Sequence, residues 1–272
     1  MGNVLLYDLS MQEVVMRGVK WLEFNVDPPS AERNTEKVYH GDITLGKTRN
    51  SRLIQAKAWY KAYDALDFKL LRDELFVHLN PHKSFYAVDG DMPGRRWKVE
   101  VESININRIN RTTAEVAVVF YCAKGVSESV YKTLDGFNMD SGMWATGMGL
   151  EADESKQDYT HSSDFFGIHN AGSVEVDPRE SELLITVRAI NGGSSKFSVK
   201  NMSTSETWEY TGTINAGDIF HIDGVKSTRN YANIVGNTNL ELISLVPGAN
   251  SFLVDGLNAG FEITFDFRYL YL

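Results

Sequence analysis

The chain has little cysteine and proline and no long apolar segment. Its 272 residues include one cysteine, Cys122, and six prolines. A single cysteine can form neither a disulfide within the chain nor a four-cysteine metal site, so stability must come from a packed core. The apolar runs are far shorter than the roughly 20 residues of a transmembrane helix. We therefore expect no membrane insertion.

Positive charge is also scarce. The chain carries 27 Lys and Arg against 36 Asp and Glu, a formal net charge of −9. Proteins that bind nucleic acid gain affinity from clustered cations that displace counterions from phosphates. The charge balance therefore argues against nucleic acid as a partner.

The length and composition are those of a folded globular protein. A chain of 272 residues is long enough for two domains, and its composition, 43% hydrophobic and 23% charged, leaves no long segment expected to be disordered. Cys122 follows the apolar positions Val116, Val118 and Phe120, so we predict a packed rather than a reactive thiol. Such a chain suits synthesis in a reducing cytoplasm.

The centre of the first half predicts a long β-hairpin. Apolar side chains alternate with polar ones over Trp97–Glu102, the period of a half-buried strand. The apolar phase then slips by one residue to Ile104 and Ile106, which predicts a bulge. The β-branched and aromatic segment Thr113–Tyr121 is the predicted return strand.

One segment has helical spacing instead. Its apolar residues recur every three or four positions, with Asp64 or Asp67 as possible N-cap and Pro81 as terminator: Phe68, Leu71, Leu75 and Leu79. The apolar stripe must pack on the hairpin. The first domain is therefore predicted to be a β-sandwich or sheet carrying one α-helix, in a mainly β chain.

Periodicity disappears after about residue 130. Gly136, Gly142, Gly147 and Gly149 alternate there with polar residues, a composition typical of a junction. We predict an N-terminal domain over residues 1–135, a linker over 136–163 and a C-terminal domain over 164–272.

The C-terminal segment predicts a second β-sandwich, because short strands recur about every ten residues with turns between them. The predicted strands are Leu183–Arg188, Ile219–Val225, Leu240–Leu245 and Phe261–Tyr271, with a turn at Pro247–Asn250. The last of them places Phe261, Ile263, Phe265, Phe267, Tyr269 and Tyr271 on one face.

The order of these parts resembles a known family. The run Leu71-Arg72-Asp73-Glu74-Leu75, then Arg95-Arg96-Trp97-Lys98-Val99, then Ala114–Phe120, is similar to the N-terminal domain of the distal tail (Dit) proteins of siphophages. The C-terminal segments that resemble the galectin-like sandwich of that family are Ala216-Gly217-Asp218, Ile222-Asp223-Gly224, Leu245–Asn250 and Arg268-Tyr269-Leu270.

This resemblance spans about Arg52 to Leu272 and implies a structural protein, not an enzyme. It implies a homohexameric ring, the hub of a baseplate at the virion tail tip, made in the host cytoplasm. Its partners would be the tail tube or major tail protein and the tail-associated lysin or baseplate proteins. The first 50 residues match the family poorly, so no contact with the tube is assigned to them.

A competing motif lies in those first residues. Gly41-Asp42-Ile43-Thr44-Leu45-Gly46-Lys47-Thr48 matches the phosphate-binding P-loop pattern. Such a loop must follow a buried strand and open a helix. Here the preceding residues are polar and the following Arg49–Arg52 is a poor helix start, so we do not expect nucleotide binding.

Carbohydrate binding is the second alternative. Galectin-like sandwiches stack sugars on an aromatic side chain, for which Trp208 and Tyr210 are the candidates, and His169-Asn170 offers polar groups. An aromatic residue in a strand usually belongs to the core. The set of polar residues that galectins use is not found around them.

No catalytic, cofactor-binding or metal-binding residue is predicted, and no cofactor. The six histidines form no His-x-His or His-x-x-x-His cluster, and there is no Gly-x-Ser-x-Gly motif. Carboxylates are frequent at 151–154 and 175–182, but nothing selects a glycosidase pair among them.

Overall fold

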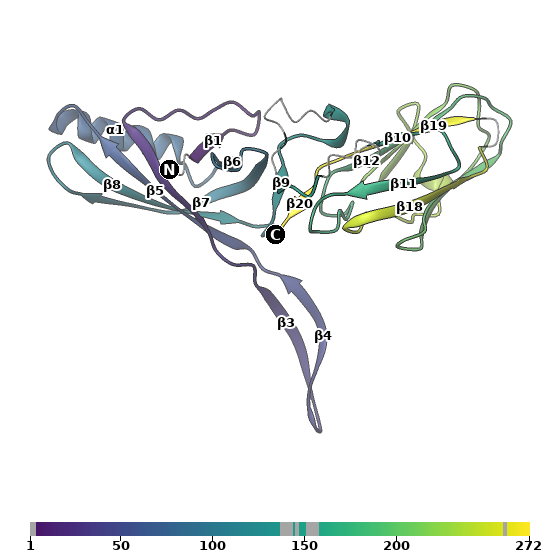
Figure 1. Ribbon diagram of the computed structural model, residues 1–272, viewed down its shortest axis with the longest axis horizontal. Helices are drawn as coiled ribbons and strands as arrows, with labels where there is room; N and C mark the ends of the chain where they lie inside the picture. Colours follow the sequence, from purple (N-terminus) through teal and green to yellow (C-terminus); the bar gives the residue numbers. More distant parts are fainter. Residues whose placement is uncertain (1–3, 137–143, 145–146, 151–157, 258–259) are drawn as a thin grey trace. The chain divides into compact units, whose positions relative to one another are not determined.

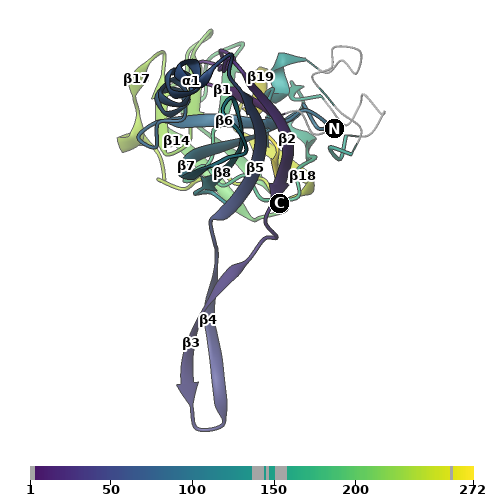
Figure 2. The same ribbon diagram turned by 90° about the vertical axis from the view of Figure 1, so that its left-hand side faces the viewer.

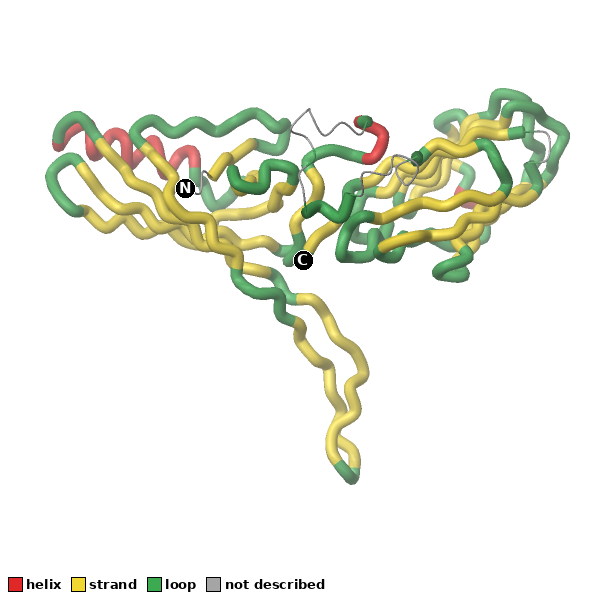
Figure 3. Tube along the Cα trace, viewed as in Figure 1, coloured by secondary structure: helices red, strands yellow, loops and turns green. Residues whose placement is uncertain are grey.

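A computed structural model describes residues 4–136, 144, 147–150, 158–257 and 260–272. Over these residues the protein is mainly β with one α-helix, as predicted (Figure 3). Its contacts divide it into two compact units, Met1–Glu128 with Leu272, and Ser129–Tyr271. The described part of the chain contains no helix long and apolar enough to cross a membrane.

The N-terminal unit is built on one antiparallel sheet. Its strands run in the order β1-β6-β7-β8-β5-β2, with β9 beside β7 (Figure 1). The bounds are β1 Val4–Tyr7, β2 Val19–Val26, β5 Arg52–Lys61, β6 Ser84–Asp89, β7 Arg95–Arg108, β8 Thr113–Cys122 and β9 Ser127–Ser129. Every second residue of β5 and β8 is buried, because successive strand side chains point to opposite faces.

The predicted hairpin and its bulge are confirmed. Strands β7 and β8 pair from Glu100↔Tyr121 to Arg108↔Ala114, and the register shifts between Val101 and Ser103. The extra residue moves the apolar side chains after it to the other parity. The slip seen in the sequence is therefore a real break in the ladder.

The predicted helix is α1, Ala65–His78. The Asp64 side chain caps it by accepting hydrogen bonds from the Leu66 and Asp67 amides, both at 2.8 Å, which decides between the two candidate caps. Phe68, Leu71 and Leu75 are buried. The Phe68 ring packs edge-on against Tyr60 of β5, 4.9 Å between centroids, so the apolar stripe covers the sheet as expected.

A two-stranded ribbon interrupts the chain between β2 and β5 (Figures 1 and 2). It consists of β3, Ala31–Val38, and β4, Gly41–Arg49, which pair only with each other. Pro28 and Pro29 precede it, and because proline has no amide hydrogen they interrupt the ladder that joins β2 to β5. We call residues 31–49 the arm.

The C-terminal unit contains two sheets. One has the order β10-β19-β12-β15-β16-β17 and the other β11-β18-β13-β14. The bounds are β10 Thr160–His161, β11 Phe165–Asn170, β12 Leu183–Ala189, β13 Lys196–Asn201, β14 Glu206–Thr211, β15 Ile219–Asp223, β16 Lys226–Arg229, β17 Ala232–Asn233, β18 Gly248–Asp255, β19 Phe261–Phe267 and β20 Leu270–Tyr271.

Aromatic side chains from the two sheets meet in the core of this unit. Phe252 of β18 packs on Phe265 of β19 at 4.8 Å, and Phe197 of β13 packs on Phe220 of β15 at the same centroid distance. The predicted sandwich and the buried face of the last strand are confirmed. That strand ends at Phe267; Leu270–Tyr271 form β20, which belongs to neither of the two sheets, and Tyr269 in the gap is itself buried.

One predicted strand is wrong. Leu240–Leu245 is not a strand; apart from one bridge between Leu245 and Val176, side chains bind several of its backbone groups. Asn201 donates to the Ser244 carbonyl at 2.7 Å, and the Ser244 amide donates to Glu206 at 2.7 Å. A buried backbone group needs a hydrogen-bond partner, which can be a side chain as well as a neighbouring strand. Here polar side chains take the place of strand pairing.

The predicted turn at Pro247–Asn250 is shorter in the structure, because the bend is at Pro247 and Gly248 already begins β18. The Asn250 side chain fixes the backbone of Val246, just before the strand. It accepts a hydrogen bond from the Val246 amide at 3.0 Å and donates to the Val246 carbonyl at 2.8 Å. The predicted turn is therefore right at its first residue, and its other three residues belong to the strand.

Most of the predicted linker, 137–143, 145–146 and 151–157, lies outside the described residues. Its described residues include Trp144, Met148 and Tyr159, which are buried, and β10, which pairs with β19. Contacts change from one unit to the next at Glu128 and Ser129. The boundaries 1–135, 136–163 and 164–272 stay a prediction.

Asp64→Ala should destabilise the N-terminal unit by about 0.5–2 kcal/mol, since it removes the only side-chain cap that α1 has in the described structure. Urea unfolding of the whole chain, followed by circular dichroism, measures the loss. The matched control is Asp73→Ala, because Asp73 is 63% exposed and pairs only with its neighbour Arg72, a contact worth little. An equal effect of both variants would contradict the capping role.

Candidate assembly surfaces

The arm is the most exposed element that the structure describes. All 19 of its residues, including the turn residues Tyr39 and His40, are exposed. Its two strands pair from Ala31↔Arg49 to Val38↔Gly41, with a register shift between Asn34 and Thr35. Both outer edges of the ribbon therefore have free backbone groups, which is the form in which strands recruit other chains.

The register of the arm sorts its charges onto two faces, because paired residues point the same way. One face, which we call the basic face, carries Ala31, Arg33, Thr35, Lys37, Asp42, Thr44, Lys47 and Arg49. The other, the acidic face, carries Glu32, Asn34, Glu36, Val38, Gly41, Ile43, Gly46 and Thr48. Leu45 is the extra residue of the bulge.

The P-loop-like motif lies in this arm. Gly41–Thr48 is part of the exposed strand β4, and the chain continues from it into β5. A P-loop binds phosphate through amides that converge at the start of a helix, whereas the amides of a strand point alternately to its two sides. The context of nucleotide binding is therefore absent around Lys47.

The two aromatic candidates for sugar stacking are core residues. Trp208 and Tyr210 of β14 are 1% and 3% exposed. The Trp208 indole N–H donates to the Ser227 hydroxyl at 3.1 Å, and Tyr210 packs on Phe220 at 4.9 Å. Neither presents a face on which a sugar ring could stack.

Of the two polar candidates beside them, Asn170 has a structural role. Asn170 is buried and donates to the carbonyls of Val174 and Leu245 at 3.1 and 3.0 Å, while its oxygen accepts from the Gly172 amide. His169 lies beside it on β11. In the part of the chain that the structure describes, no group of three His, Cys, Asp or Glu side chains is placed to hold a metal ion.

Cys122 is buried, as predicted, and its thiol donates to the Val126 carbonyl at 3.6 Å. Burial raises the pKa of this thiol, so the reactive thiolate is disfavoured. Arg52, its partner across β5 and β8, is also buried and lies 5.0 Å over the Trp97 ring. These are contacts of the core.

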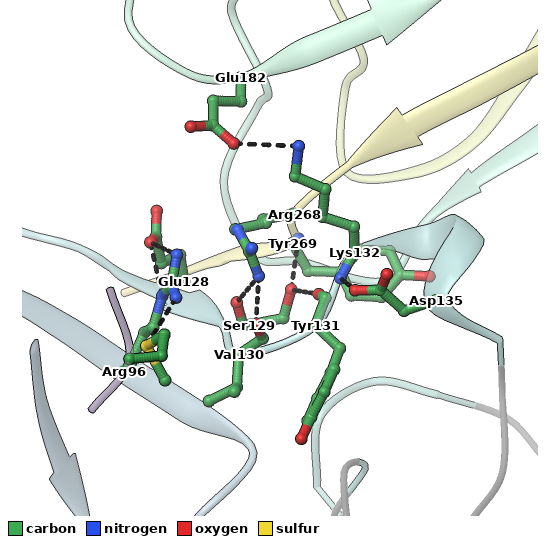
Figure 4. A network of polar contacts seen from close by, with 11 residues as sticks. Arg96, Glu128, Ser129, Val130, Tyr131, Lys132, Asp135, Glu182, Arg268 and Tyr269 are labelled. Atoms are coloured by element: carbon green, nitrogen blue, oxygen red, sulfur yellow. Dashed lines mark hydrogen bonds and ion pairs between the residues drawn. The ribbon is translucent and has the colours of Figure 1, made fainter. Parts of the chain in front are cut away.

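A polar cluster surrounds the point where the first unit ends (Figure 4). Within the N-terminal unit, buried Arg96 pairs with Glu128 at 2.7 Å and lies 3.9 Å over the Tyr86 ring. This arginine belongs to the Arg95–Val99 motif. Its role is therefore to hold β9 beside β7, since planar guanidinium groups suit both carboxylates and ring faces.

The first residues of the C-terminal unit are held by its last strands (Figure 4). The Ser129 amide donates to the Tyr269 carbonyl at 2.9 Å, and Arg268 donates to the Ser129 and Val130 carbonyls. Thr133 donates to the Phe265 carbonyl at 2.7 Å. Tyr159 and Tyr269 share a hydrogen bond of 2.5 Å, and burial raises the pKa of Tyr159 to about 12.

The arm is the feature that the sequence-based interpretation missed. Polar residues on both faces conceal the alternation that marks a half-buried strand. The available signal was the pair Pro28-Pro29 before a β-branched, charged segment and a turn at Tyr39-His40-Gly41. Gly41 has φ of +113°, a conformation that favours glycine at a turn.

Comparisons with known proteins agree with this architecture. Residues 17–122 match the model of the phage tail protein RIFT-related domain, which includes the arm. The match starts at residue 17, well before the Arg52 at which the sequence resemblance was placed. A search of curated proteins found no match.

Among solved structures, the Dit protein of SPP1, described as a hub adsorption apparatus of phages that infect Gram-positive hosts, matches with a TM-score of 0.67 and 10% identity. The alignment covers 99% of both chains. A chain of the phage p2 baseplate matches with a TM-score of 0.44 and 8% identity over 98% of both chains. A chain from the virion of a native gene transfer agent matches with a TM-score of 0.30 and 16% identity. That alignment covers 44% of the present chain and 91% of the virion chain.

Magnesium with ATP or GTP should leave the melting temperature of the wild-type chain unchanged. The melting temperature of Lys47→Ala should likewise not respond to nucleotide. A ligand at a hundredfold excess over its dissociation constant stabilises the folded state by about 2.7 kcal/mol, so real binding would be visible. Thermal unfolding with and without nucleotide is the measurement. A magnesium-dependent rise that Lys47→Ala abolishes would show that β4 rearranges into a phosphate-binding loop.

Proposed function

We propose that this chain, a Dit-like phage tail protein by its RIFT-related domain and its fold, forms a hexameric ring at the tail tip. The ring would be the hub that joins the tail tube to the host-facing baseplate or tail-associated lysin proteins. The observation that carries the proposal is the family match over residues 17–122, which includes the sheet strands β2 and β5 to β8, the helix and the arm.

The surface of the N-terminal unit supports assembly into a ring. Leu53 and Trp59 point away from the buried face of β5 and are 38% and 42% exposed. Val119 and Tyr121 of β8 share that side of the sheet and are half-buried. Leu53 lies opposite Tyr121, whereas Trp59 lies further along the same face, opposite Glu115. Exposed apolar residues such as Leu53 with its neighbours on β8 are typical of interfaces between chains.

We also propose a division of labour in which the N-terminal unit assembles and the C-terminal unit folds independently at the periphery. The C-terminal unit has an aromatic core of its own, and the two sheets that form this core lie within the unit. A sandwich of this size ordinarily folds alone. Trp208 and Tyr210 are buried within it, so no observation on them favours sugar binding.

The purified chain should form one discrete oligomer of six times the 30.6-kDa chain mass, because rings of identical subunits close. Native mass spectrometry and sedimentation across micromolar concentrations measure it. Trp59→Glu should weaken the oligomer, since it removes the 42%-exposed aromatic side chain of the uncovered sheet face and adds a carboxylate opposite Glu115. Leu66→Glu, at a 69%-exposed position of α1, is the matched control. A closed oligomer of another size would refute six-fold assembly.

The fragment of residues 129–271 should be a cooperatively folding β-rich monomer. A fragment that starts at residue 160 should melt at a clearly lower temperature, because it lacks Thr133, which bonds the β19 backbone, and Tyr159, which bonds Tyr269. Losing a buried aromatic side chain alone costs about 3–5 kcal/mol. Circular dichroism, thermal melts and mass measurements compare the two. Insolubility of both, or a hexamer of either, would refute the proposed division.

A further inference from the structure

The C-terminal unit contains a pocket between the edges of its two sheets. Its volume is about 140 Å³, and its lining comes from β14, from the β15–β16 hairpin and from the segment after β17. Four aliphatic side chains form most of its walls: Val225, Val235, Leu240 and Leu242. An engineered apolar cavity of about 150 Å³ in another protein holds benzene. The pocket therefore has room for one aromatic ring.

A hydrogen-bond donor lies at the bottom of this apolar pocket. Ser227 and Trp208 line it at 6% and 1% exposure, whereas Val225 and Leu240 at its mouth are 62% and 70% exposed. The Trp208 indole N–H donates to the Ser227 hydroxyl at 3.1 Å. Because an indole can only donate, the hydroxyl hydrogen of Ser227 remains available, and it has no other acceptor among the described residues. The pocket therefore selects a ligand with an oxygen at its buried end.

Leu240 forms one side of the mouth in a conformation that leucine rarely adopts. Its φ is +64°, which is sterically costly for a bulky side chain, and a side chain that stays 70% exposed recovers little of that cost by burial. On one flank, Asn239 accepts a hydrogen bond from the Glu209 amide at 3.1 Å and donates to the Thr207 carbonyl at 2.6 Å. On the other flank, Ile243 is buried. The fold thus holds an exposed apolar side chain rigidly beside the pocket, and backbone strain of this kind gathers at ligand-binding sites.

Negative charge marks both the mouth of the pocket and the unit around it. Glu241 lines the pocket and is exposed, and the described ion pairs of this unit use other carboxylates, such as Asp218 and Glu209. Residues 129–271 carry 19 Asp and Glu against nine Lys and Arg, a formal charge of −10, whereas the remaining residues carry +1. A partner of complementary charge therefore brings cations to this mouth, and a second copy of the same unit does not.

We propose that this pocket binds a tyrosine side chain of another protein, at a position flanked by lysine or arginine. The ring fills the apolar volume, its phenol oxygen accepts a hydrogen bond from Ser227, and the neighbouring cations face Glu241. A phenylalanine ring lacks the oxygen, and a cation alone leaves the apolar walls in water. The proposal goes beyond the ring, because every residue that lines the pocket belongs to the C-terminal unit.

Three small probes test the site in the full-length protein. Tyramine has both the phenol and the ammonium group, phenethylamine lacks the phenol oxygen, and 4-ethylphenol lacks the ammonium group. NMR titration at constant ionic strength measures the three dissociation constants. Tyramine should bind about threefold or more tighter than phenethylamine because of the hydrogen bond to Ser227. It should bind about twofold or more tighter than 4-ethylphenol because of the exposed ion pair with Glu241.

Two variants assign each preference to its residue. Ser227→Ala should reduce the affinity ratio of tyramine to phenethylamine to about one, and Glu241→Gln should do the same for the ratio of tyramine to 4-ethylphenol. Ratios are the readout because Ser227→Ala also removes the acceptor of the Trp208 indole, which alters the affinity for every probe alike.

A third variant tests the strained residue at the mouth. Leu240→Asn should weaken the binding of all three probes without lowering the melting temperature, since asparagine tolerates a positive φ better than leucine. Leu253→Asn is the matched control, because Leu253 is a 37%-exposed leucine of β18 that does not line the pocket. It should leave the three dissociation constants unchanged.

Two tripeptides with blocked ends extend the test to a protein partner. Lysine–tyrosine–lysine should bind about fivefold or more tighter than glutamate–tyrosine–glutamate. Added salt should reduce this difference, because surface charges are screened over about 10 Å at 0.1 M ionic strength. Equal binding of the two peptides overturns the basic protein partner.

The remaining outcomes separate the chemistry from the site. Equal affinities for the three small probes, or affinity ratios that survive Ser227→Ala and Glu241→Gln, overturn the assigned phenol and cation. Lack of saturable binding by every probe overturns the site itself. None of these results changes the oligomeric mass that tests the ring.

Discussion

Strand β5 is the element on which the rest of the N-terminal unit depends. Its side chains alternate without exception between buried and exposed. Ala56 and Ala58 are small enough to let neighbouring elements approach closely, and Tyr60 donates a hydrogen bond to the Phe68 carbonyl of α1. The strand begins where the arm returns and ends where the helix starts. It therefore anchors both of them to one core.

The two faces of β5 serve different purposes. The buried face makes the unit stable, because it closes the core with β8 and α1. The exposed face carries Leu53 and Trp59, which nothing in the described unit covers. Exposed apolar side chains on an uncovered sheet face are a feature of surfaces that contact other chains.

The arm follows a different physical rule from the sheet beside it. The sheet is held by apolar burial, while the arm has neither buried residues nor a third strand. The feature that distinguishes the arm is its charge pattern. The strand register places Arg33, Lys47 and Arg49 on one face. Apolar burial is non-directional, whereas complementary charges fix the relative position of two surfaces.

The C-terminal unit shows how polar side chains can replace a strand. Asn201 and Glu206 satisfy backbone groups of Ser244, and Asn170 satisfies the Leu245 carbonyl. The segment is apolar enough to resemble a strand, and it is buried like one at Ile243 and Leu245. Local sequence could not reveal the difference, because the partners lie 38 to 75 residues away.

Local patterns in the sequence determined the hairpin with its bulge, the single helix and the aromatic last strand. Each depends on spacing within a few residues, such as Asp64 before an apolar stripe or the slip between Val101 and Ser103. Tertiary structure alone decided three other features. It replaced the predicted strand Leu240–Leu245 with side-chain hydrogen bonds, turned a P-loop-like motif into one strand of the arm, and gathered the cations of that arm on one face. The physical reason is that burial and cross-strand register are relations between distant residues, which no local pattern contains.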